Sequence, residues 1–213
     1  MSERDWNEDY KAGQMPWDTG KPDEQLVELV RAKRVAPGRT LEIGCGTGTN
    51  ALWLAEQGFD VLGIDLAPLA VEQARAKLAG FGSSSRCRFE VGDFLAHVPA
   101  GTFAFVFDRG CWHCFDDPAE QADFAARVAS CLAPDGLWVS LIGSTEGGPR
   151  EFGPPRRSAR DIALAIEPHL AIEELTAMRF TINAPAPAMA QPASWRCAAR
   201  RRSVPAQPST RHS

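Results

Sequence analysis

A short apolar run followed by three alternating glycines limits the fold of this chain more than any other feature. Residues 40–50 read TLEIGCGTGTN, and residues 50–58, NALWLAEQG, suit a helix that stops at its glycine. A glycine loop between a buried strand and a helix is typical of nucleotide-binding βαβ units, because the loop lets a ligand approach the backbone closely. The segment therefore predicts an α/β fold with a ligand at this turn.

The alternation of strand-like and helix-like segments continues along the chain. We expect strands at 40–44, 59–65, 86–93, 102–108, 137–143, 171–180 and 194–201, and helices at 24–35, 50–58, 68–80, 117–132 and 158–168. Because strands that alternate with helices form right-handed βαβ units, the pattern predicts a Rossmann-like, seven-stranded, mostly parallel sheet with helices on both faces. No helical segment separates the last two strands, so we expect a hairpin and an antiparallel last strand.

The length and composition fit one domain. The 213 residues are 44% hydrophobic, which is enough for a single core, so we expect one domain over residues 1–200. Within it, residues 1–20 carry Trp6, Tyr10 and Trp17 in a polar context and are predicted to form a lid. The arginine-rich and proline-containing end, residues 201–213, is predicted to be a disordered tail.

Charge, cysteine content and the first residues bear on location and partners. The chain has no run of 18 apolar residues, its first ten residues are charged, and its six cysteines are scattered, which favours a cytoplasmic protein with reduced thiols. A net charge of −4 argues against a nucleic-acid partner. We expect a small-molecule acceptor, no membrane partner, and a monomer or weak homodimer.

Two carboxylates distinguish among the possible nucleotides. Asp65 ends the predicted strand 59–65, where a carboxylate can hold ribose hydroxyls. Glu42 precedes the glycines, and a carboxylate there would repel a pyrophosphate but would attract a ligand that carries an ammonium and a sulfonium. S-adenosylmethionine is such a ligand. The glycines also lack the lysine of a phosphate-binding loop, which disfavours ATP.

The segments LEIGCGTGTNALWLA, VLGIDLAP and VGDF resemble the class I S-adenosylmethionine-dependent methyltransferases. The resemblance implies that the glycine loop admits the methionine end, that Asp65 binds the ribose diol, and that Asp93 and Phe94 flank the adenine. It further implies that Asp108 and Arg109 lie near the transferred methyl. The cofactor-binding residues implied in this way are Trp17, Glu42, Gly44, Cys45, Gly46, Gly48, Asp65, Leu66, Asp93, Phe94 and Asp108.

Three further segments, MPWDTGKP, FVFDRGCWHCF and EFGPPRRSARDI, resemble the thiopurine S-methyltransferase-like group, which includes small thiol, tellurite and halide methyltransferases. The N-terminal tryptophans of that group help to close the cofactor site, which implies this role for Trp17. An aromatic ring beside a sulfonium is also physically favourable. The resemblance implies a methyltransferase that acts on a small molecule.

The CWHC string, residues 111–114, allows a metal site or a catalytic histidine. Cys111, His113 and Cys114 supply three possible ligands, but a structural zinc site needs four, so we expect no metal. We instead expect His113 in a loop over the site, where it accepts a proton from the nucleophile or orients it. The predicted catalytic residues are thus His113, Asp108 and Arg109.

The absence of a strong base cluster favours a soft nucleophile. A thiol supplies some thiolate near pH 7 and attacks a sulfonium methyl without a strong base. The leading hypothesis is therefore methyl transfer to a thiol or another sulfur nucleophile. Two alternatives stay open: methylation of an oxygen, nitrogen or halide acceptor, and a protein that binds S-adenosylmethionine without catalysis.

Overall fold

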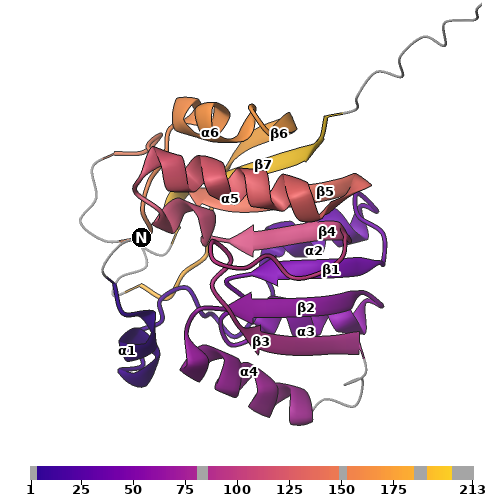
Figure 1. The fold of residues 1–213 in the computed structure, drawn as a ribbon. Helices are drawn as coiled ribbons and strands as arrows, with labels where there is room; N and C mark the ends of the chain where they lie inside the picture. Colours follow the sequence, from indigo (N-terminus) through magenta and orange to yellow (C-terminus); the bar gives the residue numbers. More distant parts are fainter. Residues whose placement is uncertain (1–3, 81–85, 149–152, 185–190, 203–213) are drawn as a thin grey trace, which may run out of the picture.

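The computed structural model describes residues 4–80, 86–148, 153–184 and 191–202, which form a seven-stranded sheet with helices around it (Figure 1). The strand order is β3-β2-β1-β4-β5-β7-β6. Strands β1 to β5 are parallel, whereas β7 pairs antiparallel with both β5 and β6. This topology confirms the predicted mostly parallel sheet with an antiparallel last strand. The bounds are β1 Arg39–Ile43, β2 Asp60–Asp65, β3 Cys87–Val91, β4 Phe103–Arg109, β5 Leu132–Gly143, β6 Leu170–Arg179 and β7 Ala193–Arg201.

The helices begin where the sequence places capping residues. Asp23 caps α2, and Ser158 and Asp161 form a capping box at α6. Pro68 occupies the first turn of α4, where its missing N–H costs nothing. The bounds are α1 Trp6–Lys11, α2 Glu24–Arg31, α3 Thr49–Glu56, α4 Pro68–Ala79, α5 Pro118–Cys131 and α6 Ala159–Ile166, with a 3-10 turn, η2, at Trp112–Cys114.

Two element boundaries differ from the prediction by more than two residues. The helix predicted at 24–35 ends at Arg31, because Lys33 takes a left-handed φ of 55° and Arg34 N bonds back to Leu29 O. Residues 133–136, which connect the predicted helix at 117–132 to the predicted strand at 137–143, lie within β5, which begins directly after α5 at Leu132. Its pairing with β4 shifts register between Phe103 and Phe105, so the extra residues are absorbed as a bulge.

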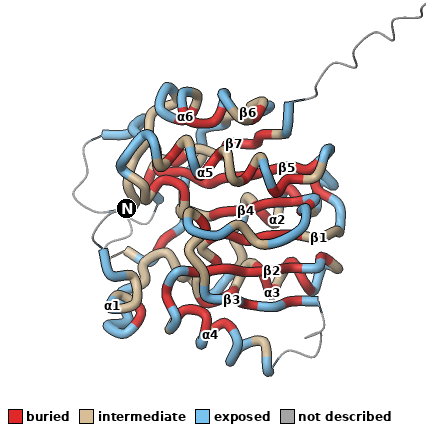
Figure 2. The backbone as a smooth tube through the Cα atoms, in the orientation of Figure 1, coloured by how far each residue is buried: buried red, intermediate tan, exposed pale blue. Residues whose placement is uncertain are grey.

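The sheet is buried on both faces, as Figure 2 shows for the central strands. Helices α2, α3 and α4 pack on one face, with Phe105 and Phe107 of β4 beneath them. Helices α5 and α6 pack on the other face, against Leu41 and Ile43 of β1 and against Trp138 of β5. Because alternate side chains of a central strand enter opposite cores, these strands are almost continuously apolar.

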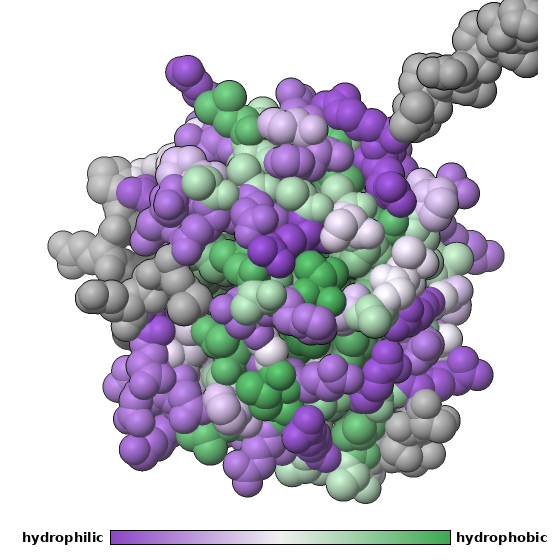
Figure 3. Space-filling view, in the orientation of Figure 1, coloured by the Kyte–Doolittle hydropathy of each residue, from purple (hydrophilic) through white to green (hydrophobic). Residues whose placement is uncertain are grey.

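The carboxyl ends of β1, β2 and β4 point toward the side of the molecule where α1 lies (Figure 1). On the face seen in Figure 3, apolar side chains gather in the middle, between polar side chains above and below. Within the described residues, no helix has the length and apolar character needed to cross a bilayer. The tail predicted at 201–213 lies outside the described residues, apart from Arg201, which ends β7, and Arg202.

Candidate active site

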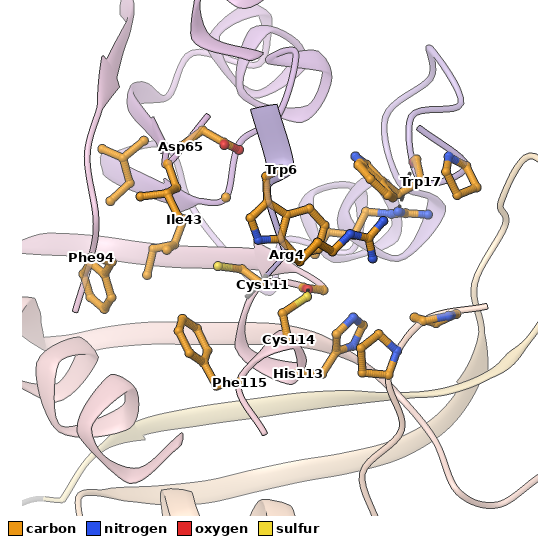
Figure 4. Close-up of a pocket in the computed structure, with 18 of the residues that line it drawn as sticks. Arg4, Trp6, Trp17, Ile43, Asp65, Phe94, Cys111, His113, Cys114 and Phe115 are labelled. Atoms are coloured by element: carbon orange, nitrogen blue, oxygen red, sulfur yellow. Dashed lines mark hydrogen bonds between the residues drawn. The ribbon is translucent and has the colours of Figure 1, made fainter. Parts of the chain in front are cut away.

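A cavity of about 390 Å³ lies at the carboxyl ends of the parallel strands. Five parts of the chain line it: the N-terminal segment 4–17, the ends of β1 to β3 with the residues that follow them, residues 109–115 after β4, residues 153–155, and residues 180–182 after β6. In Figure 4, Asp65, Ile43 and Phe94 lie on one side, Trp17 lies on the opposite side, and Trp6, Arg4 and Cys111 lie between them.

The glycine loop joins β1 to α3 in backbone conformations that favour glycine. Gly44 has a φ of 68°, and a side chain there would meet the Cβ of Cys111 at 2.9 Å. Gly48, with a φ of 80°, is the N-cap residue of α3, and a side chain there would meet the ring of Phe89 at 2.6 Å. The loop is therefore tightly closed, and of its glycines Gly44 lines the cavity.

Asp65 ends β2 and holds the glycine loop in place. Its Oδ2 accepts a hydrogen bond from Gly46 N at 2.8 Å, and its Oδ1 accepts one from Ala67 N at 2.9 Å. Burial raises the pKa of this carboxyl above its usual value, and the two backbone hydrogen bonds oppose the rise. The carboxylate lines the cavity at a fixed position beside the loop.

Asp93 and Phe94 follow β3 on the same side of the cavity. Asp93 Oδ1 accepts a hydrogen bond from Leu95 N at 2.9 Å, and Phe94 packs against Phe124 with ring centroids 4.9 Å apart. Leu66 completes this side with a side chain that is 41% exposed. Apolar side chains between the Asp65 and Asp93 carboxylates suit a flat polar ring joined to a sugar.

Glu42 lies beneath the glycine loop rather than in the cavity wall. It is 1% exposed, its Oε1 accepts a hydrogen bond from Asn50 Nδ2 at 3.0 Å, and its Oε2 has no hydrogen-bond partner. Burial raises the pKa of Glu42 to about 8, and the Asn50 hydrogen bond opposes this rise. Asn50 Oδ1 in turn accepts from Asp23 N, which connects Glu42 to the start of α2.

The N-terminal aromatic residues pack together over the cavity. Trp17 contacts Trp6 edge-on at 5.6 Å and Tyr10 at 6.1 Å, and Trp17 Nε1 donates to the Tyr10 hydroxyl at 3.3 Å. Asn7 Oδ1 accepts from Leu69 N, so α1 rests on the start of α4. The described part of residues 1–20 therefore covers the cavity. Its predicted movement as a lid stays a prediction.

Arg109 connects the N-terminal segment to the segment that follows β6. Its Nε bonds Asp23 Oδ2 at 2.6 Å, Nη1 donates to Trp17 O at 3.2 Å, and Nη2 donates to Thr181 O at 2.7 Å. The side chains of the Arg109–Asp23 pair are only 12% and 6% exposed. The guanidinium also stacks on Phe180 at 5.0 Å. Arg109 thus holds two distant segments together at the cavity.

Asp108 supports the loop that carries His113. It is fully buried, Oδ1 accepts from the backbone N of Cys111 and Trp112, and Oδ2 accepts from Trp138 Nε1 at 3.0 Å. Burial raises the pKa of Asp108 to about 6. The expectation that Asp108 lies near a transferred group does not match this geometry, because its carboxylate faces the core and not the cavity.

The structure brings together many, but not all, of the predicted site residues. Those that line the cavity are Trp17, Gly44, Asp65, Leu66, Asp93, Phe94, Arg109 and His113. Glu42, Cys45, Gly46, Gly48 and Asp108 lie behind the wall, where they support the loops. Among the described residues, Cys111, His113 and Cys114 are not part of any group of three or more such side chains that could hold a metal ion.

Arg157 and Phe180 contribute to the site but were not among the residues predicted from the sequence. Arg157 Nη2 donates to the carbonyls of His113 and Phe115 at 2.8 and 2.7 Å, and so it fixes the loop after β4. Its position in the PPRRS string was the available signal. Phe180 lines the cavity and meets the His113 ring edge-on at 6.1 Å, but a phenylalanine at the end of a predicted strand reads as core.

Comparisons with known proteins agree with this geometry. A family model described as thiopurine S-methyltransferase (TPMT) matches residues 1–176. A probable thiol methyltransferase 2 of Arabidopsis thaliana is 32% identical over 147 residues, which cover 68% of this chain and 65% of that protein. A 2-heptyl-1-hydroxyquinolin-4(1H)-one methyltransferase of Mycobacteroides abscessus is 25% identical over 175 residues, which cover 81% of this chain and 75% of that protein.

A solved structure is similar over most of the chain. It comes from work on the conversion of a disulfide bond into a thioacetal group during echinomycin biosynthesis. The two superpose with a TM-score of 0.73 at 28% identity, and the match covers 87% of this chain and 84% of the other.

Proposed function

This chain belongs to the thiopurine S-methyltransferase family, and we propose that it transfers the methyl group of S-adenosylmethionine to a small sulfur nucleophile. The observation that carries the proposal is the cavity closed by aromatic residues. The family match includes four of the five parts of the chain that line this cavity, all except residues 180–182. Relatives named as thiol and thiocyanate methyltransferases support a sulfur acceptor.

The residues on one side of the cavity fit S-adenosylmethionine. The fixed Asp65 carboxylate would hold the ribose diol, and Asp93 and Phe94 would hold the adenine. Glu42 does not line the cavity, and burial raises its pKa to about 8, so its role here is to support the loop at the methionine end through Asn50 rather than to contact the ligand. When bound, the cofactor supplies a methyl group activated by a sulfonium. The rings of Trp6 and Trp17, which already face the Arg4 guanidinium at 4.3 and 5.4 Å, would favour that cation as well.

The other side of the cavity fits a small acceptor with an apolar body. Phe115, Phe180 and Ile182 supply apolar wall, and Pro154 and Pro155 add rigid surface. This chain's own contribution is to exclude water and to hold the acceptor in line with the methyl group. Asp65 and Asp93 lie at the cofactor end, and Arg109, whose charge is paired with Asp23, lies at the acceptor end.

An oxygen acceptor is the second candidate. The Mycobacteroides abscessus relative is named for a hydroxyquinolone, whose acidic hydroxyl also ionises without a strong base. Nitrogen or halide acceptors, and binding without turnover, are further outcomes that a product assay separates. We also propose that the protein is cytoplasmic, that it acts as a monomer or weak homodimer, and that it binds no nucleic acid, in line with its net charge of −4.

The direct test incubates the full chain with methyl-labelled S-adenosylmethionine and single acceptors. The panel contains thiophenol, 2-mercaptoethanol, sulfide, thiocyanate, iodide and a hydroxyquinolone, and each methylated product is identified by mass. We expect the fastest turnover with a thiol or thiocyanate. Turnover only with the hydroxyquinolone would replace sulfur by oxygen as the acceptor. Tight cofactor binding with no product from any acceptor would overturn the enzymatic proposal.

A further inference from the structure

A single hydrogen bond decides which nitrogen of His113 carries the proton. His113 is 3% exposed and lines the cavity, and its Nδ1 lies 2.8 Å from the backbone N of Gly143 at the end of β5. A backbone N–H can only donate, so Nδ1 is the acceptor in this bond. The neutral ring therefore carries its proton on Nε2.

The surroundings of Gly143 make this hydrogen bond hard to exchange for another. Gly143 pairs with Ser194 in the sheet, and its carbonyl accepts from Arg157 N at 2.8 Å. A side chain at position 143 would collide with the Pro155 carbonyl. From the same segment, Arg157 donates to the His113 carbonyl. Both the ring and the backbone of His113 are thus anchored, and a flip of the ring would leave the Gly143 N–H buried without an acceptor.

The Nε2 edge of the ring lies beside Gly110, which also lines the cavity. A Cβ built on Gly110 would be 3.0 Å from both Nε2 and Cε1 of His113, so only a glycine lets the ring take this position. On another side, Phe180 meets the ring at an interplanar angle of 86°. The imidazole edge next to Gly110 therefore presents an N–H and not a lone pair.

We propose that His113 is a hydrogen-bond donor to the methyl acceptor and not its general base. This inference rests on the methyl transfer proposed above. A nitrogen that already carries a proton has no lone pair to receive another, and protonation of Nδ1 would set two N–H groups against each other. His113 Nε2–H instead stabilises a negative or lone-pair-rich acceptor atom.

The acceptor must then arrive already ionised, and the step balances without a proton transfer to the protein. The thiol loses its proton to water before it binds. A lone pair on the thiolate sulfur forms the new bond to the methyl carbon as the bond from that carbon to the sulfonium sulfur breaks. The electron pair of the broken bond stays on that sulfur, which becomes a neutral thioether. Acceptors that ionise readily are therefore preferred over aliphatic alcohols, and ammonium groups are rejected by the donor.

The test compares two variants with a matched control. His113→Gln keeps an N–H donor near the position of Nε2, whereas His113→Phe keeps a ring with no donor. The control is His169→Gln, at a partly exposed histidine after α6 that does not line the cavity. All three are tested for cofactor binding by calorimetry. Then kcat/KM is measured from pH 5 to pH 10 with thiophenol and with the less acidic 2-mercaptoethanol.

We expect His113→Phe to lose about 10- to 100-fold in kcat/KM, because a hydrogen bond to a charged atom is lost. His113→Gln should stay within about tenfold of the unmodified protein, and the control should be unchanged. The rising limb of the kcat/KM profile should lie at lower pH with thiophenol than with 2-mercaptoethanol, because it reports the acceptor's own ionisation.

Other outcomes separate the two proposals. A rising limb that stays at one pH for both thiols and vanishes in both His113 variants would identify His113 as a base and overturn this inference. The two thiols are compared first with the unmodified protein, so this comparison remains decisive if a variant does not fold. Equal activity of His113→Phe and the control would also overturn it. Absence of turnover with every acceptor, despite cofactor binding, would instead refute the proposed function.

Discussion

The two ends of the cavity are built in different ways. The cofactor end is local: the glycine loop, Asp65, Asp93 and Phe94 lie at the ends of three neighbouring parallel strands. Asp65 accepts from Gly46 N through its side chain and from Gly92 N through its carbonyl. The acceptor end is assembled from distant parts of the chain, residues 4–23, 109–116, 153–157 and 180–183, which meet through side chains. The cofactor site is therefore fixed mainly by neighbours in the sheet, whereas the acceptor site depends on contacts between distant segments of the chain.

Removal of residues 1–17 gives the largest expected effect, because it opens the composite end while leaving the sheet intact. The first strand begins only at Arg39, so we expect a folded core by circular dichroism. Turnover should fall at least about 100-fold, since the reacting groups lose their fixed geometry and their shelter from water. Cofactor affinity should fall as well. Full turnover in the truncated protein would reduce these residues to surface packing.

Asp65→Ala tests the local end. The substitution removes the acceptor of the Gly46 and Ala67 N–H groups and the carboxylate proposed for the ribose diol. We expect cofactor binding to weaken by about 1–3 kcal/mol, measured by calorimetry, with the thiol KM little changed. The matched control is Asp60→Ala, at an exposed carboxylate at the other end of β2. Unchanged affinity in a folded Asp65→Ala variant would remove Asp65 from the cofactor site.

Glu42→Gln tests a pH dependence that belongs to the local end. Because folding raises the pKa of Glu42 from about 4.5 to about 8, the folded protein keeps the proton that the unfolded chain loses. Burial of the Glu42 carboxyl therefore takes no ionisation penalty from the free energy of unfolding below pH 4.5. As the pH rises from 4.5 toward 8, it lowers the free energy of unfolding progressively. Glutamine mimics the protonated carboxyl at every pH.

We expect the difference in unfolding free energy between the variant and the unmodified protein to grow by on the order of 2 kcal/mol from pH 6 to pH 8, in favour of the variant. Urea unfolding at both pH values measures this gap. A gap that does not change with pH would mean that the carboxyl is ionised in the folded protein throughout this range.

Arg109→Lys gives the smallest expected effect and tests the link within the composite end. Lysine keeps the charge but cannot reach Asp23, Trp17 and Thr181 together. We expect KM for the thiol to rise several-fold, with calorimetry showing cofactor affinity nearly unchanged. Arg127→Lys, in an exposed pair with Asp123, is the control. A larger loss in cofactor affinity than in thiol KM would show that the two ends are coupled through Arg109.

The same contrast explains what the sequence could predict. The parallel sheet and the cofactor end follow from local patterns, since each strand and the polar residue after it are adjacent in sequence. Arg157 and Phe180 could not be found in this way, because their roles depend on contacts with residues 113–116, which are more than forty positions away. The family resemblance implied that Asp108 lies near the transferred methyl, but its side chain faces the core, where Trp138 donates to it.

The position of β7 has a consequence for how the protein is made on the ribosome. This strand follows the other described strands in sequence, yet it lies between β5 and β6 and pairs with both. Until residues 193–201 leave the ribosomal exit tunnel, β6 has no neighbour in the sheet and β5 has an unpaired edge. The half of the sheet that holds the cofactor end can form earlier during synthesis, whereas the half beneath the acceptor end must wait until residues 193–201 have emerged. A nascent protein would thus have its cofactor loop in place well before it could hold an acceptor.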